Sequence, residues 1–311
     1  MIYIFLAFRG TRTTHADALH QAGRRAEAET RFREAEQMQQ GRQPDYPLLY
    51  SLPGFRYCDL HLTEAERAAW CLGRVGVSPA VPGVPPGTSG SPAPQSSGWD
   101  CQRVRRDAEP GGPEAHPTPE LAAACRAVSQ RAAQSLEWAK SQDWLLDIAL
   151  DHLTLGRAAL YAPILETGPL DPLGGASLPL DRTRECAEHL DAAVSGLRRA
   201  GHQDYLPLGL LTRAWLRFLT GARTGRESAQ EDLDEAWEIA ERGPMRLFLA
   251  DIHLYRARLF FREAVYPWAG DDAGNPRGPK DDLKAAEALI DRCGYHRRDG
   301  ELADAWEAIG R

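Results

Sequence analysis

The chain has 311 residues, of which 43% are hydrophobic and 8% aromatic, enough to build a folded core. Its 44 acidic and 37 basic residues are mixed along the sequence and give a net charge of −7, which argues against a broad basic surface for nucleic acid. The six cysteines are scattered without a CxxC pair, so the composition favours a reducing, cytoplasmic setting over a disulfide-rich secreted domain.

The apolar opening "MIYIFLAF", residues 1–8, is too short to cross a membrane, which takes roughly 20 apolar residues. It also lacks the basic lead and the small-residue cleavage site of a signal peptide. We therefore expect an irregular N-terminus over residues 1–14 and no membrane partner, with a remnant of a targeting segment as the alternative.

Two helices joined by a tight turn at Gly23 are predicted to follow from residue 15. Ala28, Phe32 and Ala35 are separated by four and then three residues, which places them on one helix face. Small residues on such a face let a neighbouring helix approach closely. This spacing predicts a helical hairpin.

The next apolar segment repeats the same spacing at Tyr50, Gly54 and Tyr57. Pro53 lies within it, and an interior proline removes a helix hydrogen bond and clashes with the preceding turn. We therefore expect either a kink or a late helix start. Residues 15–70 form the N-terminal part of the predicted helical region.

Residues 71–118 differ in character, because "SPAVPGVPPGTSGSPAPQSSG" and "AEPGGPEAHPTP" hold ten of the 22 prolines and show no periodicity. Such a composition cannot bury enough surface to offset its ordering entropy. The segment is predicted to be a disordered insertion, and a frameshifted stretch is the alternative.

Helical patterns resume over residues 119–311, where a small or apolar residue, a leucine and an alanine recur at four-then-three spacing. The period between equivalent alanines is 43 residues in one case and 54 in another, with the excess in loops. The repeated positions are Ala132, Leu136 and Ala139, then Cys186, Leu190 and Ala193, then Ala229, Leu233 and Ala236, and the helices between them carry Gly156, Ala214 and Ala257.

The turn glycine and the spaced small residues in "GRRAEAETRFREA" resemble the second helix of the tetratricopeptide repeat, and Tyr50, Gly54 and Tyr57 resemble its first helix. Phrases such as "LDIALDHLTLGRA" are similar to tetratricopeptide-like arrays of large bacterial signalling and defence proteins linked to NTPase modules. The resemblance implies an all-α, right-handed α-solenoid of about five helical hairpins, split by the insertion. Hairpins of this kind bury their apolar faces by stacking.

The resemblance also implies a partner-binding groove, because first helices line the concave side of such arrays. Arg157, Trp215 and Arg258 directly follow the small positions of three successive first helices. They would grip a peptide with acidic and apolar groups, since arginine pairs carboxylates and tryptophan supplies an anchor. The alternative is that they pack between repeats. On the groove hypothesis, Arg157→Ala and Arg258→Ala weaken partner capture without unfolding the chain.

Residues with catalytic chemistry occur without a defined motif. Asp147, Asp151 and His152 cluster on one predicted helix, and Asp251 and His253 occupy the equivalent place in a later one. Cys186 and His189 form a CxxH pair with no second half, and a structural zinc site takes about four ligands. HExxH and GxxxxGK[ST] motifs are absent from the sequence.

We therefore expect a non-catalytic, cytoplasmic scaffold for a protein or peptide partner, without a cofactor, a metal or nucleic acid. Two alternatives are a sensor array detached from an NTPase-type protein and a helical enzyme or metal protein that uses the Asp and His positions. The basic clusters "GLRRAG" and "GYHRRD" are expected to complement helix C-termini.

Overall fold

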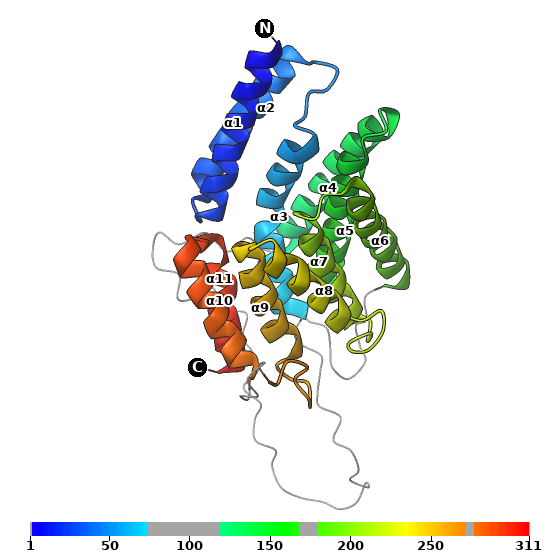
Figure 1. The fold of residues 1–311 in the computed structure, drawn as a ribbon. Coiled ribbons are helices and arrows are strands. Elements are labelled where there is room, and N and C mark those ends of the chain that lie inside the picture. Colours follow the sequence, from blue (N-terminus) through cyan, green and yellow to red (C-terminus); the bar gives the residue numbers. More distant parts are fainter. Residues whose placement is uncertain (1, 74–117, 168–178, 271–276, 311) are drawn as a thin grey trace, which may run out of the picture.

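The computed structural model describes residues 2–73, 118–167, 179–270 and 277–310, with side chains from residue 11 onward, and over these ranges all regular elements are helices (Figure 1). The helices are α1 (Ile2–Gln21), α2 (Arg25–Arg42), α3 (Ser51–Gly73), α4 (Thr118–Ser141), α5 (Leu145–Thr167), α6 (Leu180–Ala200), α7 (Leu206–Leu219), α8 (Ala229–Arg242), α9 (Arg246–Phe260), α10 (Pro279–Cys293), the short 3-10 helix η1 (His296–Arg298) and α11 (Asp299–Ile309).

The N-terminal part differs from expectation in one respect: α1 begins at Ile2, where an irregular segment was predicted over residues 1–14. Within the described residues, no helix combines the length and the apolar character needed to cross a bilayer. α3 begins at Ser51, which places Pro53 in the first turn, where a missing N–H leaves no helix hydrogen bond unmade. Apart from residues 71–73 and 118, the predicted insertion lies outside the described residues.

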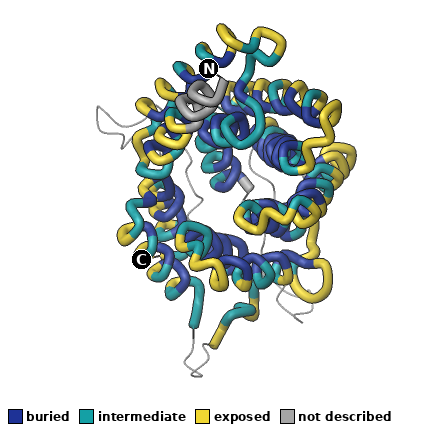
Figure 2. The backbone as a smooth tube through the Cα atoms, turned by 45° about the horizontal axis from the view of Figure 1, so that its top comes forward, coloured by how far each residue is buried: buried dark blue, intermediate teal, exposed yellow. Residues whose placement is uncertain are grey.

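Each helix from α1 to α3 and from α4 to α11 contacts the next one along the chain, and α3 contacts α4 across the undescribed segment. The odd-numbered helices also contact one another in succession, from α1 and α3 through to α9 and α11. The two ends of this series meet, because α11 contacts α3 and η1 contacts α1. Figure 2 shows the result as a ring of helices around a common centre.

Small residues allow the helices to approach closely. A Cβ atom on Gly156 of α5 would lie 2.6 Å from a side-chain carbon of Leu190 on α6, and one on Gly196 would lie 2.8 Å from the side chain of Ala149. Gly23 adopts a φ of +75° in the turn between α1 and α2, a conformation that glycine tolerates best.

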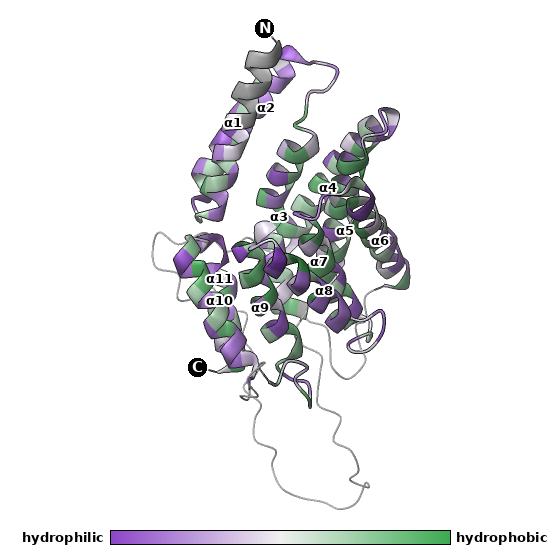
Figure 3. Ribbon diagram, viewed as in Figure 1, coloured by the Kyte–Doolittle hydropathy of each residue, from purple (hydrophilic) through white to green (hydrophobic). Residues whose placement is uncertain are grey.

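The predicted repeat positions lie almost entirely in the interior. Gly23 is exposed and Tyr50 is half-buried, whereas the others are buried: Ala28, Phe32, Ala35, Gly54, Tyr57, Leu136, Gly156, Leu190, Ala193, Ala214, Leu233, Ala236 and Ala257. In Figure 3 hydrophilic residues dominate α2, while α5 is largely hydrophobic. This agrees with burial, since α5 has neighbours in α3, α4, α6 and α7.

Candidate partner-binding site

The three residues predicted to line a groove lie close to one another in the interior. The indole of Trp215 stacks on that of Trp70 from α3, with ring centroids 3.9 Å apart and planes 11° from parallel. The guanidinium of Arg258 lies over the indole ring of Trp70, 4.1 Å from the ring centroid. Tyr161, which also contacts Trp215, accepts a 3.3 Å hydrogen bond from Nε of Arg157.

Arg157 belongs to a buried ionic network. Its guanidinium donates to Asp59 at 2.8 Å and to Glu66 at 3.0 Å, both on α3. Arg298 of η1 donates to the second oxygen of Glu66 at 3.0 Å and to Asp251 at 2.8 Å, and Arg297 donates to Asp59 at 2.5 Å. The network joins α3, α5, α9 and η1, so it holds the two ends of the helix series together.

The arginines of this network keep its carboxylates ionised. Burial alone would raise the pKa of Glu66, but Arg298 and Arg157 lower it to about 2. Burial would likewise raise the pKa of Asp59, and Arg297 and Arg157 hold it well below its ordinary value. Each charge therefore has partners of opposite sign within hydrogen-bond distance, which is the condition for burying it.

The structure corrects the expectation that Arg157, Trp215 and Arg258 face an open groove. Their side chains are 1%, 1% and 2% exposed, so they present no surface to a partner in this conformation. The physical reason is that α3 packs against α5, and that α5, α7 and α9 contact one another in succession. Trp70, Asp59 and Glu66 of α3 therefore cover these three side chains.

Sequence reasoning did not identify Asp59 and Glu66 as members of the network. They are seven residues apart, two turns on one helix face, and this face is otherwise apolar around Leu62 and Trp70. Two acidic residues on a core-facing surface are a signal for buried arginine partners. The basic cluster "GYHRRD" supplied two of those partners, which instead were expected to complement a helix end.

The Asp and His positions with catalytic potential are engaged in structural contacts. Ser51 donates to Asp147 at 2.7 Å, and Asp151, one turn further along α5, is buried with a pKa that burial raises to about 8. Asp251 accepts hydrogen bonds from Tyr295 and Arg298. His253 contacts Asp282 with Nδ1 2.6 Å from the carboxylate.

The CxxH pair is divided between two environments. Cys186 is buried, and its thiol donates to the carbonyl of Gly156 at 3.3 Å, while His189 is half-buried and meets His152 across the α5–α6 contact. The five cysteines among the described residues are free thiols. Over these same ranges, no group of three or more His, Cys, Asp or Glu side chains is arranged to hold a metal ion.

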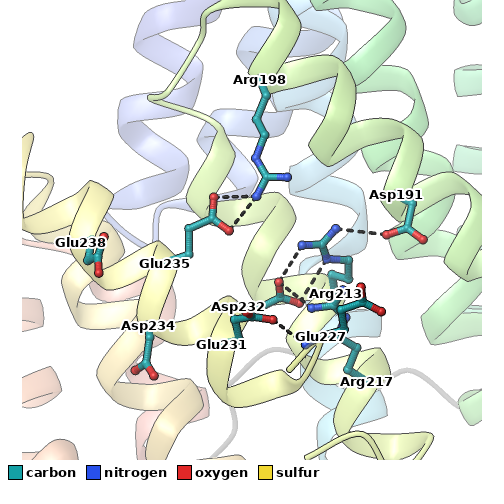
Figure 4. A pocket seen from close by; sticks show the side chains of 10 residues that line it. All are labelled: Asp191, Arg198, Arg213, Arg217, Glu227, Glu231, Asp232, Asp234, Glu235 and Glu238. Carbon is teal, nitrogen blue, oxygen red and sulfur yellow. Dashed lines mark hydrogen bonds and ion pairs between the residues drawn. The ribbon is translucent and has the colours of Figure 1, made fainter. Parts of the chain in front are cut away.

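A polar pocket of about 640 Å³ lies between α6, α7 and α8 (Figure 4). Arg198 points toward Glu235 at 2.6 Å, and Arg213 bridges Asp191 at 3.1 Å and Asp232 at 2.7 Å. The lining holds seven carboxylates against three guanidinium groups: Asp191, Glu227, Glu231, Asp232, Asp234, Glu235, Glu238, Arg198, Arg213 and Arg217.

The arginines of this pocket form ion pairs with its carboxylates. Arg213 and Arg217 both pair with the buried Asp232, and Glu231 accepts from the backbone N–H of Glu227 at the start of α8. Because these groups already have partners within the chain, a ligand would have to displace those partners to use them. The pocket ties α6, α7 and α8 together and disfavours anionic groups.

A second, more apolar hollow of about 440 Å³ lies where α3 and α5 begin. We call it the aromatic groove, and its lining comprises Tyr50, Ser51, Trp144, Leu145, Leu146 and Asp147. Trp144 is 38% exposed and Leu145 is 42% exposed, two of the few large apolar side chains on the described surface. The Tyr50 and Trp144 rings stack at 5.8 Å.

The aromatic residues of the groove also contact aromatic residues outside its lining. Tyr46 contacts Tyr50 and meets the edge of Trp138 from α4, with ring centroids 5.3 Å apart in the second case. Ser51, the first residue of α3, and Asp143, in the turn just before Trp144, have φ angles of +59° and +53°. Non-glycine residues rarely adopt this conformation, and it is found preferentially at ligand-binding segments.

Comparison with protein-family models, with curated proteins and with solved structures gives no match for this chain. The candidate site therefore rests on the geometry of the chain itself. Of these two hollows, the aromatic groove offers apolar area to a partner, whereas the polar pocket offers charges that are already paired.

Proposed function

We propose that this chain is a non-catalytic scaffold, built of tetratricopeptide-like helical hairpins, which binds a segment of a partner protein in the aromatic groove. The succession of contacts between consecutive helices and between odd-numbered helices supports a repeat architecture. The observation that carries the binding proposal is the exposure of Trp144 and Leu145 beside Tyr50 in a hollow of about 440 Å³.

The groove has the composition of an interaction hot spot. Tryptophan and tyrosine supply large, stiff contact areas, and such residues dominate binding energy at protein interfaces. Burying the exposed parts of Trp144 and Leu145 under an aromatic or aliphatic side chain of the partner would remove apolar surface from water. Asp147 also lines the groove, and its carboxylate accepts a hydrogen bond from Ser51 that fixes the beginning of α3 against α5.

A displayed library of random peptides tests this proposal with the intact protein. Peptides selected on the wild-type chain should carry an aromatic or large aliphatic residue. Trp144→Ala should weaken their binding about thirtyfold, the loss of about 2 kcal/mol that defines a hot spot. Leu145→Ser should act in the same direction.

The chain offers matched controls, because Leu180 and Val265 are also exposed apolar residues, at 86% and 76%, and lie outside the groove lining. Leu180→Ser and Val265→Ser should leave peptide binding unchanged. The proposal is wrong if the selected peptides bind Trp144→Ala as tightly as wild type, or if they depend on Leu180 instead.

A further inference from the structure

The loop between α2 and α3, residues 43–50, supplies one wall of the aromatic groove, and we call it the wall loop. It carries Tyr50, whose ring stacks on Trp144 at 5.8 Å, and Tyr46, which contacts Tyr50. These eight residues form neither helix nor strand. The position of Tyr50 therefore depends on contacts that the wall loop makes with neighbouring helices.

Leu49, directly before Tyr50, is held at both polar groups of its backbone. Its N–H donates to Oε1 of Glu36 on α2 at 2.8 Å. Its carbonyl accepts from Nη2 of Arg131 on α4 at 3.4 Å, and its side chain is buried. The wall loop is thus fixed between α2 and α4 at the residue next to the groove.

Glu36 and Arg131 also bind each other. Nη1 of Arg131 donates to Oε2 of Glu36 at 3.2 Å, and Nη2 donates to Oε1. The guanidinium lies over the ring of Tyr57 on α3, 5.0 Å from its centroid. Two parallel hydrogen bonds give such a pair a defined orientation. The pair can therefore present one acceptor and one donor to Leu49 in fixed places.

Gly54 of α3 confines the same peptide group from the other side. A Cβ atom at this position would overlap the carbonyl carbon and oxygen of Leu49, which pack directly against the helix. The close approach at Gly54 therefore accommodates the wall loop. The carbonyl of Leu49 has Arg131 on one side and α3 on the other.

Ser51, on the other side of Tyr50, is held in an unfavourable conformation. Its φ of +59° is rare for a residue other than glycine. Such a conformation persists only where surrounding contacts over-determine it. The contacts at Leu49 and the 2.7 Å hydrogen bond from Ser51 to Asp147 provide this constraint. Tyr50 is therefore placed between two fixed residues.

We propose that Glu36 and Arg131 are positioning residues of the aromatic groove, which hold Leu49 and thereby place Tyr50 against Trp144 before a partner binds. Neither residue lines the groove, so both act through the wall loop. The inference rests on the proposed function for its consequence. A groove whose wall is already ordered binds without the entropic cost of ordering it.

The indole N–H signal of Trp144 in ¹⁵N NMR spectra tests the placement of Tyr50 without any peptide. Trp144→Phe assigns the signal, and Tyr50→Leu shows where it lies when the stack is absent. Glu36→Leu and Arg131→Met should each move the signal toward that second position. The core indole signals of Trp70 and Trp215 should stay in place, which shows that the variants are folded.

Two companion variants separate positioning from a simple link between helices. Glu36→Gln keeps an acceptor for the N–H of Leu49 and should lie closer to wild type than Glu36→Leu. The double variant Glu36→Arg/Arg131→Glu restores an ion pair between α2 and α4, but puts a donor at the N–H of Leu49 and an acceptor at its carbonyl. Recovery of the wild-type Trp144 signal in this double variant would show that the pair merely joins two helices.

Glu29→Leu is the matched control, because Glu29 lies on α2 and pairs with Arg33 of the same helix at 2.7 Å. It should leave the Trp144 signal and peptide binding unchanged. Glu36→Leu should weaken the binding of Trp144-dependent peptides roughly tenfold, the cost of ordering a loop side chain or two on binding.

The inference is overturned if both Glu36→Leu and Arg131→Met keep the wild-type Trp144 signal, or if they bind peptides as tightly as Glu29→Leu does. A library that yields no Trp144-dependent peptide contradicts the proposed function instead. In that case the Trp144 signal still decides whether Glu36 and Arg131 position Tyr50, so the two failures are distinguishable.

Discussion

Arg157 and Arg258 occupy corresponding places on α5 and α9, yet the structure predicts opposite responses to the same substitution by methionine. Arg157→Met removes the guanidinium that serves Asp59 and Glu66, both buried. Breaking a buried ion pair from one side typically costs about 3–5 kcal/mol, because the remaining charge stays in a low-dielectric interior. In a chain of 311 residues, with about 2.1 cal/mol/K of unfolding entropy per residue, such a loss lowers Tm by roughly 5–8 °C.

Arg258 has no such partners. Among the residues that the structure describes, none offers a hydrogen bond to its three guanidinium nitrogens, and its guanidinium lies over the face of Trp70. Burial without an acceptor lowers the pKa of Arg258, a sign that its charge is poorly compensated. Arg258→Met keeps an apolar contact with the indole and removes the buried charge. We therefore expect stability within about 1 kcal/mol of wild type, or above it.

Urea unfolding of the two variants, followed by circular dichroism, measures the difference directly. The reasoning fails if Arg157→Met unfolds within about 1 kcal/mol of wild type, or if Arg258→Met is as destabilised as Arg157→Met. Arg157→Lys is a useful companion, because it keeps the charge but not the fork that reaches two carboxylates, and it should fall between the two.

Two further substitutions probe electrostatics and packing. Burial raises the pKa of Asp151 to about 8, so its favourable contribution is present below the unfolded pKa near 4 and is lost as the pH rises to 8. Asp151→Asn should therefore gain stability over wild type between pH 5 and pH 8 in urea titrations, and a pH-independent difference would contradict this. Gly156→Ala would place a methyl 2.6 Å from Leu190 and should cost about 1–3 kcal/mol. Gly41→Ala, with no atom within 4 Å, should instead add about 0.5–1 kcal/mol, and equal thermal shifts for the two would refute the packing argument.

Local periodicity was sufficient to predict helices after residue 15 and many of the residues at which they touch, but not the first part of α1, which begins at Ile2. Ala28, Phe32 and Ala35 are buried because their spacing defines a helix face, and that spacing is visible within eight consecutive residues. Of the two outcomes expected around Pro53, a kink or a late helix start, the structure has a helix that starts at Ser51.

The environment of Arg157 could not be predicted in this way. Its acceptors lie 98 and 91 positions earlier in the chain, and the second partners of those acceptors come from residues 297 and 298. Contacts at such separation depend on how all the intervening helices pack, which no single helix encodes. The aromatic groove is similar, because it combines the beginnings of two helices that are separated by an undescribed segment.

Ring closure also has a consequence for the order in which the chain is made. In an open array each hairpin is complete once its neighbour exists, but Asp59 obtains Arg297 as a partner only from residues 238 positions further on. During synthesis, α3 therefore emerges with two core carboxylates whose arginine partners are translated much later. The helices around α3 therefore cannot reach their final burial until η1 has left the ribosome.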